Sequence, residues 1–385
     1  MTANTRLLTP MQSQVPGRVS KAMTQPMLTF RTKEFRAMFE AVCVDLKHLF
    51  QTSGDVLTLT TSGTGAMEAA VINFLRHGDE IVTIEGGKFG ERWSEIARIY
   101  GLRVNALKVP WGESVAPDDV GEFVRRHSDA AAVFLTHSET STGVAFDVEA
   151  IAAAIRRRCD ALIIVDGMSA VGVLPFFKDS WGIDVCVSAS QKGAMLPPGL
   201  AFVAVNDRGW HAASRSDLPR YYLDLHRARE ALQTFDTAWT PATSLIMGLR
   251  ESLRLIVEED LQRRWQRFAR LAKAIREGAN AMELELFARS PSNAVTAIRV
   301  PKEIDGGELV NRLRDPYGVI VAGGQEHLKG KIFRVAHMGY CDETDIVALA
   351  SALESALRDL GWRFELGKGV TAVQAAYASD VGSGE

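Results

Sequence analysis

The stretch Leu162-Ile163-Ile164-Val165-Asp166 decides the fold class of this chain. Four consecutive apolar residues are typical of a strand that is buried on both faces, as in a parallel sheet covered by helices. In such a sheet, ligands bind at the carboxyl ends of the strands. The stretch therefore predicts an α/β protein with the Asp166 carboxylate at the ligand-binding edge, where a buried charge needs a cationic partner. A helix cap or an ordinary ion pair is the alternative role for this carboxylate.

Similar short apolar runs recur on both sides of this stretch and alternate with helical patterns. The runs span residues 56–59, 80–84, 132–135, 185–187 and 201–205. Apolar residues spaced by three and four predict amphipathic helices at residues 32–50, 66–76 and 91–100. Strands and helices in alternation indicate βαβ units and a mostly parallel sheet.

We expect the chain to divide into three parts. Residues 1–23 predict an extended arm that gains order by lying on another surface, such as a second subunit. Residues 24–260 carry the sheet pattern and predict a large domain. Residues 261–385 predict a smaller α+β domain with a frayed tail, and the helical pattern of 244–282 predicts a long helix that leaves the large domain.

Composition excludes several classes of protein. The 385 residues carry 44 Lys and Arg against 47 Asp and Glu, a net charge of −3 without a long basic run, so we expect no nucleic-acid partner. No apolar run approaches the roughly 20 residues that a membrane-spanning helix needs, and no secretory signal is recognisable, so we expect a cytoplasmic protein without a membrane partner. Four widely spaced cysteines without CxxC pairs predict reduced, mostly buried thiols and no metal site.

A phosphate cradle is the first candidate site. The segment Thr61-Ser62-Gly63-Thr64-Gly65-Ala66-Met67-Glu68 joins a predicted strand to a predicted helix, so its small residues leave backbone N–H groups free for an anion. A dinucleotide fingerprint fails because Glu68 stands at the third glycine, and a Walker motif fails because no Gly-Lys-Ser/Thr follows. Taken alone, a segment of this kind is more often a plain strand-to-helix turn.

Lys192 is the second candidate. It follows another apolar run, in Ser188-Ala189-Ser190-Gln191-Lys192-Gly193, where small neighbours leave space around it. Most lysines are solvated, but lysine is also the side chain that bonds covalently to an aldehyde when its pKa is lowered. A phosphate cradle, a carboxylate and a lysine at one sheet edge are the groups that pyridoxal phosphate requires for its phosphate, its ring nitrogen and its aldehyde.

A series of short motifs extends this pattern along nearly the whole chain. The motifs are Leu8-Thr9-Pro10, Ser62-Gly63-Thr64-Gly65, Gly87-Lys88-Phe89-Gly90-Glu91-Arg92, His137-Ser138-Glu139-Thr140-Ser141-Thr142-Gly143, Val165-Asp166-Gly167-Met168-Ser169, Ser190-Gln191-Lys192-Gly193, Thr240-Pro241 and Phe333-Arg334-Val335-Ala336-His337-Met338-Gly339. In kind and order they resemble the motifs of class V aminotransferases of fold type I, in particular the alanine–glyoxylate and serine–glyoxylate aminotransferase group. The resemblance implies a pyridoxal phosphate enzyme that is a homodimer with shared active sites.

By position, the resemblance also implies individual roles. Lys192 is implied to bond to the cofactor aldehyde and to move the proton, Asp166 to pair with the ring nitrogen, and Arg334 to grip the substrate carboxylate. Without the resemblance, a surface ion pair is the more frequent role for an arginine such as Arg334. The implied cofactor contacts are Ser62, Gly63, Thr64 and Gln191 at the phosphate, Phe89 and Met168 on the two faces of the ring, Thr140 at the phenolic oxygen, and Thr237 and Thr240 at the phosphate of the neighbouring subunit. His137 and His337 are expected to be packing residues rather than catalytic bases.

Two departures from the family pattern concern the substrate and the phosphate. Met11-Gln12 stands where relatives commonly have Gly-Pro beside the substrate, and Thr237 stands where relatives often have tyrosine. The expected reaction moves an amino group from a small amino acid, such as alanine or serine, to a small 2-oxo acid, such as glyoxylate or pyruvate. The alternatives are a 2-aminoethylphosphonate–pyruvate or pyridoxamine–pyruvate aminotransferase, a carbon–sulfur lyase, and a binding scaffold without activity.

Overall fold

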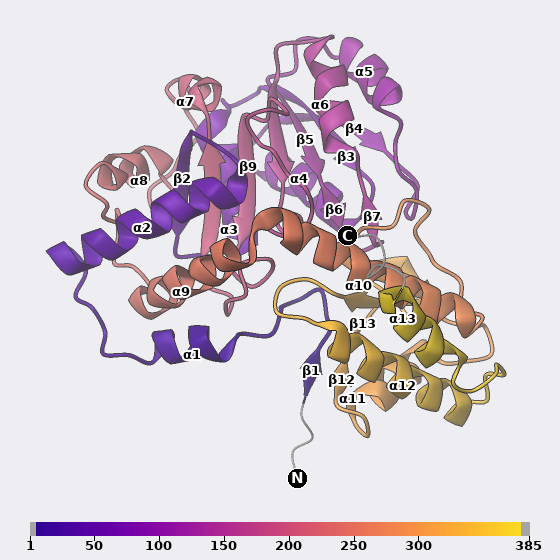
Figure 1. Cartoon of the computed structure of the whole chain (residues 1–385). Helices are drawn as coiled ribbons and strands as arrows, with labels where there is room; N and C mark the ends of the chain where they lie inside the picture. Colours follow the sequence, from indigo (N-terminus) through magenta and orange to yellow (C-terminus); the bar gives the residue numbers. More distant parts are fainter. Residues whose placement is uncertain (1–4, 379–385) are drawn as a thin grey trace.

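A seven-stranded sheet forms the centre of the protein in a computed structural model that describes residues 5–378 (Figure 1). The strand order is β2-β10-β9-β8-β5-β3-β4. The strands are β2 (Asp55–Leu59), β3 (Glu80–Glu85), β4 (Arg103–Lys108), β5 (Ala132–Thr136), β8 (Leu162–Asp166), β9 (Val185–Ala189) and β10 (Ala201–Val205). All neighbours pair in parallel except β10, which is antiparallel to β2 and β9. The predicted mostly parallel sheet is confirmed.

Strand β8 contributes to the core on both faces of the sheet. Ile163 and Val165 join the apolar cluster on one face, and Leu162 and Ile164 join the cluster on the other. The first face is covered by α2 (Lys33–Phe50), α5 (Pro117–Arg125), α6 (Val148–Arg156) and α9 (Thr243–Glu259). The second face is covered by α3 (Gly63–Phe74), α4 (Lys88–Ile99), α7 (Asp207–Ala213) and α8 (Leu225–Leu232). Burial on both sides explains why β8 reads as an uninterrupted apolar run.

Sequence analysis did not predict β4 at the edge of the sheet. Its residues are exposed or half-buried, so the segment lacks the apolar run by which the other strands were found. Because β4 has only one neighbour, its side chains need less apolar surface than those of a central strand.

A second apolar core lies in the C-terminal part, which Figure 1 draws in orange and yellow. Its three-stranded antiparallel sheet has the order β11-β14-β13. The elements here are α10 (Leu261–Ala281), β11 (Val295–Arg299), α11 (Gly306–Arg314), β12 (Val319–Ile320), β13 (Ala322–Gly323), η1 (Glu326–Leu328), β14 (Ile332–Ala336), α12 (Glu343–Asp359) and α13 (Lys368–Ala378). The single long helix predicted over 244–282 is wrong: the chain breaks at Asp260, whose φ of 72° ends α9 and whose carboxylate caps α10. The domain boundary after residue 260 stays a prediction, and the frayed tail lies outside the described residues from 379 onward.

The N-terminal arm lies on its own chain. Strand β1 (Arg6–Leu7) pairs in parallel with β12, and α1 (Gly17–Met23) packs against α9. The arm is thus not extended throughout, because residues 17–23 are helical, and the surface on which its described residues lie belongs to the same chain. The segment between β1 and α1 runs past Lys192, because the Ser13 N–H donates to the Gln191 carbonyl at 2.8 Å.

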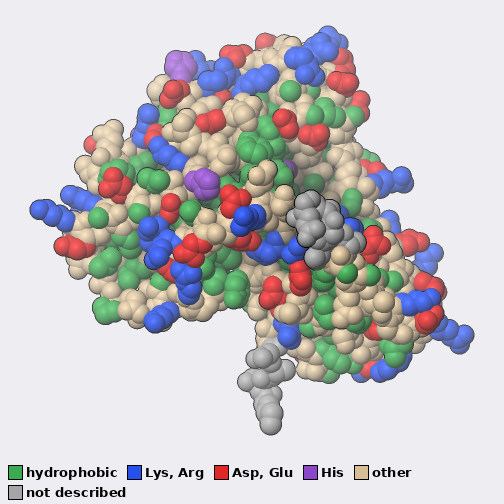
Figure 2. Space-filling view, viewed as in Figure 1, with side chains coloured by type: hydrophobic (Ala, Val, Ile, Leu, Met, Phe, Trp, Pro, Cys, Tyr) green, Lys and Arg blue, Asp and Glu red, His purple; other side chains and the backbone are tan. Residues whose placement is uncertain are grey.

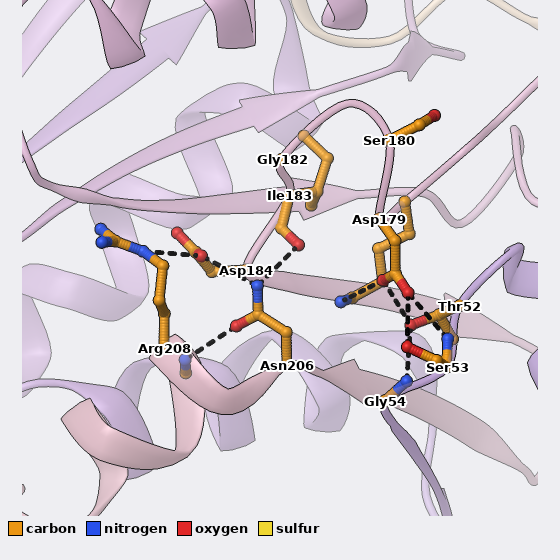
Figure 3. A network of polar contacts seen from close by, with 12 residues as sticks. Thr52, Ser53, Gly54, Asp179, Ser180, Gly182, Ile183, Asp184, Asn206 and Arg208 are labelled. Atoms are coloured by element: carbon orange, nitrogen blue, oxygen red, sulfur yellow. Dashed lines mark hydrogen bonds and ion pairs between the residues drawn. The ribbon is translucent and has the colours of Figure 1, made fainter.

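Two aspartates hold the crossover between β8 and β9 at the end of the sheet opposite Asp166 (Figure 3). Asp179 accepts hydrogen bonds from the Thr52 hydroxyl at 2.6 Å and from the Ser53 N–H at 2.7 Å. Asp184 accepts from the Asn206 amide at 3.1 Å and pairs with Arg208 at 3.2 Å. The network therefore fixes the end of the crossover that leads into β9.

The surface carries both signs of charge. On the face in Figure 2, acidic and basic side chains are interspersed around α9 and α10. Within residues 5–378, no helix combines the length and apolarity needed to cross a bilayer.

Candidate active site

The N-terminus of α3 forms the predicted cradle. Ser62 caps the helix, and its hydroxyl accepts from the Gly65 N–H at 3.4 Å. A Cβ on Gly63 would lie 2.7 Å from the Met168 sulfur, so the helix start and the Met168 side chain are in close contact here. The free N–H groups and the dipole of this turn favour an anion.

Asp166 is the last residue of β8 and is almost fully buried. Its Oδ1 accepts a hydrogen bond from the Met168 N–H at 2.8 Å. Burial raises the pKa of Asp166 to about 7, although this hydrogen bond and the positive charges of Lys192 and Arg92 act in the opposite direction. A cationic ring nitrogen beside this carboxylate would favour its ionised form.

Lys192 lies in the turn after β9 and is also buried. Its ammonium group donates a hydrogen bond to the carbonyl of Pro10, which the N-terminal segment brings into the site. Burial lowers the pKa of Lys192 to about 8, with Asp166 opposing the shift and Arg334 adding to it. The lowered pKa increases the fraction of neutral amine near physiological pH, and the neutral amine is the form that acts as a nucleophile toward an aldehyde.

These groups line one cavity of about 140 Å³. It brings together nine of the predicted site residues: Ser62, Gly63, Thr64, Phe89, Thr140, Asp166, Met168, Gln191 and Lys192. Met67, Arg92, Ser138 and Ser169 also line the cavity, and sequence analysis gave them no role. Arg92 belonged to a recognised motif and stands three residues after Phe89, one helical turn away, which was the available signal.

Phe89 is held by Glu139, a residue whose role sequence analysis missed. The buried Glu139 carboxylate accepts from the N–H groups of Phe89 and Gly90, both at 3.0 Å, at the first turn of α4. Its other oxygen accepts from the Ser141 N–H at 3.1 Å. Burial raises the pKa of Glu139, and these donors oppose that shift. The carboxylate therefore caps α4 and fixes the backbone beneath the Phe89 ring.

Arg334 lies on β14 behind the cavity and is not among its lining residues. Its guanidinium donates to the Gly323 carbonyl at 2.8 and 2.9 Å and to the Thr140 carbonyl at 2.9 Å. These contacts use three of its five N–H groups, and within residues 5–378 it has no ion pair. The side chain is buried, and burial lowers the pKa of Arg334 to about 10. A buried cation with free donors suits a carboxylate ligand.

Thr237 and Thr240 do not reach the Lys192 cavity of their own chain. They line a separate small pocket with Thr60 and Tyr222. The Thr237 hydroxyl donates to the Trp239 carbonyl at 2.8 Å, so its proton is already used. Their contact with a neighbouring subunit's phosphate stays a prediction.

His137 and His337 are buried outside the cavity lining. The His137 ring lies 5.8 Å from the rings of Phe176 and Trp181, and His337 Nε2 lies 3.0 Å from the Thr296 hydroxyl. Burial lowers the pKa of His137 to about 4 and that of His337 to about 3. Both surroundings fit the expected packing roles.

The donor set of the cavity fits pyridoxal phosphate. The N–H and hydroxyl groups of the cradle can bind an anion, Asp166 is available for a basic ring nitrogen, and Lys192 is available for an aldehyde. Thr140 supplies a hydroxyl, and Phe89 supplies an aromatic face.

Comparison with known proteins identifies the family. The sequence profile of the family described as "Aminotransferase class-V" matches residues 14–346. The chain belongs to the class-V aminotransferase family. The resemblance seen in the sequence motifs is confirmed, and the protein is an aminotransferase of a family that depends on pyridoxal phosphate.

Several relatives match this class-V aminotransferase over nearly its whole length. A serine–glyoxylate aminotransferase of Hyphomicrobium methylovorum is 36% identical, and the match covers 98% of this chain and 96% of that protein. An L-aspartate–glyoxylate aminotransferase of Paracoccus denitrificans is 34% identical, with 98% and 97% covered. A protein of Synechococcus named "Soluble hydrogenase, small subunit" is 40% identical, with 95% and 96% covered.

Solved structures agree with the fold of this class-V aminotransferase. The ureidoglycine–glyoxylate aminotransferase of Bacillus subtilis superposes with a TM-score of 0.93 at 28% identity, covering 98% of this chain and 99% of that one. The pyridoxamine–pyruvate aminotransferase of Mesorhizobium loti gives 0.93 at 26% identity, with 97% of each chain covered. The expected fold type I architecture is confirmed.

Proposed function

We propose that this class-V aminotransferase binds pyridoxal phosphate in the Lys192 cavity and uses it to transfer an amino group from an alanine- or serine-type amino acid to glyoxylate or pyruvate. The donor becomes a 2-oxo acid, and the acceptor becomes an amino acid. The observation that carries this proposal is the convergence of Lys192, Asp166 and the α3 cradle on one cavity. The bound cofactor would supply an aldehyde for the amino group and a ring that delocalises the electron pair of the departing α-proton.

The protein's own residues position and move the proton. With its pKa lowered to about 8, Lys192 can take the α-proton and return it nearby as a general acid. Asp166, at the sheet edge, would pair with the ring nitrogen of the bound cofactor and keep it protonated. Arg334, with two N–H groups left after its contacts with the Gly323 and Thr140 carbonyls, binds the carboxylate that donor and acceptor share.

The names of the relatives and the size of the site support small substrates. Relatives use serine or aspartate as donor and glyoxylate as acceptor, according to their names. We assign the cavity of about 140 Å³ to the cofactor, so little further space is left there for a substrate. The N-terminal segment restricts it further, since Pro10 contacts Lys192. Met11 beside it is 64% exposed, so it can contact a substrate without displacing the core.

A spectroscopic experiment tests the proposal. Wild-type protein loaded with pyridoxal phosphate should show the visible band of the lysine-bound cofactor and lose it when L-alanine or L-serine is added. Glyoxylate or pyruvate should restore the band and yield glycine or alanine. Lys192→Ala should lack the band, whereas Lys108→Ala at the exposed end of β4 should behave like wild type. A wild-type protein that stays colourless would refute the cofactor assignment.

Two alternative donors are outcomes of the same experiment. Loss of the band only with 2-aminoethylphosphonate would point to a phosphonate donor. If free pyridoxamine and pyruvate alone are converted, without a bound phosphorylated cofactor, the enzyme is of the pyridoxamine–pyruvate type.

A carbon–sulfur lyase is disfavoured by the cysteines. Cys43, Cys186 and Cys341 are buried, and burial raises the pKa of each thiol, to about 12 for Cys43. No cysteine lines the Lys192 cavity. The hydrogenase name of one relative does not favour a second function either: among residues 5–378, no group of three or more His, Cys, Asp or Glu side chains is arranged to hold a metal ion.

We also propose a cytoplasmic homodimer with shared sites. The free cysteines of this chain suit a reducing compartment. Tyr221 and Tyr222 are 68% and 50% exposed and stack on Trp239, beside Thr237 and Thr240, which makes this aromatic surface a good contact for a second copy.

Mixing two inactive variants tests the shared site. Light scattering should give twice the 42.1 kDa chain mass. If Thr240 binds the cofactor phosphate in the partner's site, a mixture of co-refolded Lys192→Ala and Thr240→Ala chains should regain activity. Half of the dimers in an equal mixture contain one chain of each kind, and each of these has one intact site of two. The mixture should therefore show about a quarter of wild-type activity at limiting cofactor. Activity no higher than the sum of the two homodimers would contradict sharing.

A further inference from the structure

Arg92 is a cation at the cradle that makes no ion pair within residues 5–378. It lies on α4, lines the Lys192 cavity and is half-buried. Its Nη1 lies 3.3 Å from the Thr64 hydroxyl, and its guanidinium carbon lies 4.8 Å from the centre of the Phe89 ring. These two contacts fix the guanidinium at the mouth of the cradle, beside the first turn of α3.

The acidic residues nearest to Arg92 in the sequence form ion pairs with another cation, Lys88. Glu91 and Glu95 of α4 pair with Lys88, at 3.9 and 3.0 Å. Glu326 pairs with Lys88 as well, at 3.7 Å. Within residues 5–378, Arg92 itself has no ion pair. A partly enclosed cation of this kind is stabilised by an anion, and arginine matches phosphate through two parallel N–H groups.

The charge of the cradle supports a phosphate at this position. A phosphate monoester carries about two negative charges near neutral pH. The α3 N-terminus offers the equivalent of about half a positive charge, and Ser62, Thr64 and Gln191 offer only neutral groups. A full positive charge is therefore needed on the same side, and Arg92 is the arginine among the lining residues. Arg334 lies behind Thr140 instead, where we assign it to the substrate carboxylate.

We propose that Arg92 is the cationic ligand of the cofactor phosphate, and that it makes the site select the phosphorylated form of pyridoxal. This inference rests on the proposed function, because it assumes that pyridoxal phosphate binds at Lys192. Phe89 has a second role in it, since the face of its ring holds the guanidinium in place before the phosphate arrives.

The test compares two ligands that differ only in the phosphate. Full-length protein freed of cofactor is titrated with pyridoxal phosphate and with pyridoxal, and binding is followed by tryptophan fluorescence and by the visible band. The variants are Arg92→Gln and Arg92→Lys. Arg98→Gln, on the exposed side of the same helix, is the matched control.

We expect the affinity for pyridoxal phosphate to fall at least about tenfold in Arg92→Gln, whereas the affinity for pyridoxal stays within about twofold. Arg92→Lys should recover part of the loss because it keeps the charge, and Arg98→Gln should match wild type. Inorganic phosphate should compete with pyridoxal phosphate in wild type and less effectively in Arg92→Gln.

Two results would overturn the inference. Equal losses for both ligands would mean that Arg92 acts by packing on Phe89, and unchanged affinities would mean that it does not reach the phosphate. Failure of the wild type to bind either ligand would instead refute the proposed function and the inference with it. If Arg92→Gln does not fold, Arg92→Lys carries the comparison, with an expected smaller loss for pyridoxal phosphate alone.

Discussion

At the scale of single residues, burial shifts the pKa values of Asp166 and Lys192 toward each other. The pKa of Asp166 rises to about 7 and that of Lys192 falls to about 8, because both charged forms lose solvation. Neighbouring titratable groups with such shifts are typical of catalytic sites. Burial of these two groups consequently lowers the free energy of unfolding of the cofactor-free protein. A ligand that supplies compensating charges stabilises the site.

Replacing Asp166 by Asn should lower kcat/KM on the order of 100-fold or more, because the ring nitrogen loses its ionic partner. The same change should stabilise the cofactor-free protein at pH 8. The pKa of Asp166 is about 7 when folded and 3.8 ordinarily, so the folded state holds a proton that the unfolded state has released, and wild type loses stability as the pH rises from about 4 to 7.

Steady-state kinetics measure the loss of activity. Urea unfolding of the cofactor-free wild type and Asp166→Asn at pH 5 and pH 8 measures the change in stability. Asp118→Asn, with a side chain 98% exposed, is the control. A variant that keeps full activity would show that Asp166 has no part in the reaction.

Replacing Arg334 by Lys should raise KM for both the amino acid and the 2-oxo acid at least about tenfold, with a smaller effect on kcat. A lysine cannot serve the Gly323 and Thr140 carbonyls and still offer a planar pair of N–H groups to a carboxylate. Steady-state kinetics with both substrates measure this, and Arg299→Lys at the exposed end of β11 is the control. An unchanged KM would remove Arg334 from the substrate site.

At the scale of elements, α4 depends on a carboxylate from outside the helix. Its N-cap residue Gly87 offers no side chain, and the Ser141 hydroxyl and the Glu139 carboxylate accept from the N–H groups of Lys88, Phe89 and Gly90. The α3 N-terminus has only its own Ser62, which leaves that helix end available for a ligand. The two helices that border the cavity therefore differ in what they can bind.

Glu139→Ala should lower the free energy of unfolding by about 2 kcal/mol or more, because the α4 and Ser141 donors lose their acceptor in the core. Glu139→Gln should cost less, since its amide oxygen can still accept from α4. Urea denaturation measures both variants, and Glu149→Ala in the exposed first turn of α6 is the control. If Glu139→Ala is as stable as wild type, the carboxylate is not the cap of α4.

At the scale of the whole molecule, the site lies where three distant parts of the chain meet. The central sheet supplies Asp166 and Lys192, the C-terminal sheet supplies Arg334, and the N-terminal segment crosses between them. Gly339 permits this crossing: its φ is 76°, and a Cβ there would lie 3.0 Å from the Lys192 carbonyl oxygen and would overlap Ser13. The packing that joins these parts also buries two histidines.

Wild type should lose stability relative to a His137→Phe variant as the pH falls below 6.5. Burial lowers the pKa of His137 to about 4 in the folded state, against 6.5 ordinarily. Between these two pH values the unfolded state binds a proton that the folded state does not bind. The difference should grow by about 1.4 kcal/mol for each pH unit down to about pH 4. Phenylalanine fits the cluster with Phe176 and Trp181.

Urea unfolding at several pH values compares the two proteins. His211→Gln, at an exposed position of α7, should leave the pH dependence unchanged. Parallel curves for wild type and His137→Phe would show that His137 titrates normally in the folded protein.

Much of the site could be predicted because its residues follow apolar strands. Asp166 ends β8 and Lys192 lies in the turn after β9, and parallel strands bring their carboxyl ends to one edge. Edge strand β4 was not predicted because it lacks an apolar run. The break at Asp260 was not predicted because the helical spacing of apolar residues continues through it. Glu139 escaped as well: its partners on α4 lie about fifty residues away, and no local pattern marks them.

The sequence by itself determined the fold class, the family and the lysine and aspartate at the sheet edge, since these depend on local periodicity and on motifs of adjacent residues. Only the tertiary structure decided that Glu139 caps α4, that Arg92 faces the cradle without an ion pair among residues 5–378, and that Arg334 donates to the Thr140 carbonyl. The physical reason is that hydrogen bonding, burial and the resulting pKa shifts depend on which distant segments pack together, and packing is a property of the whole chain.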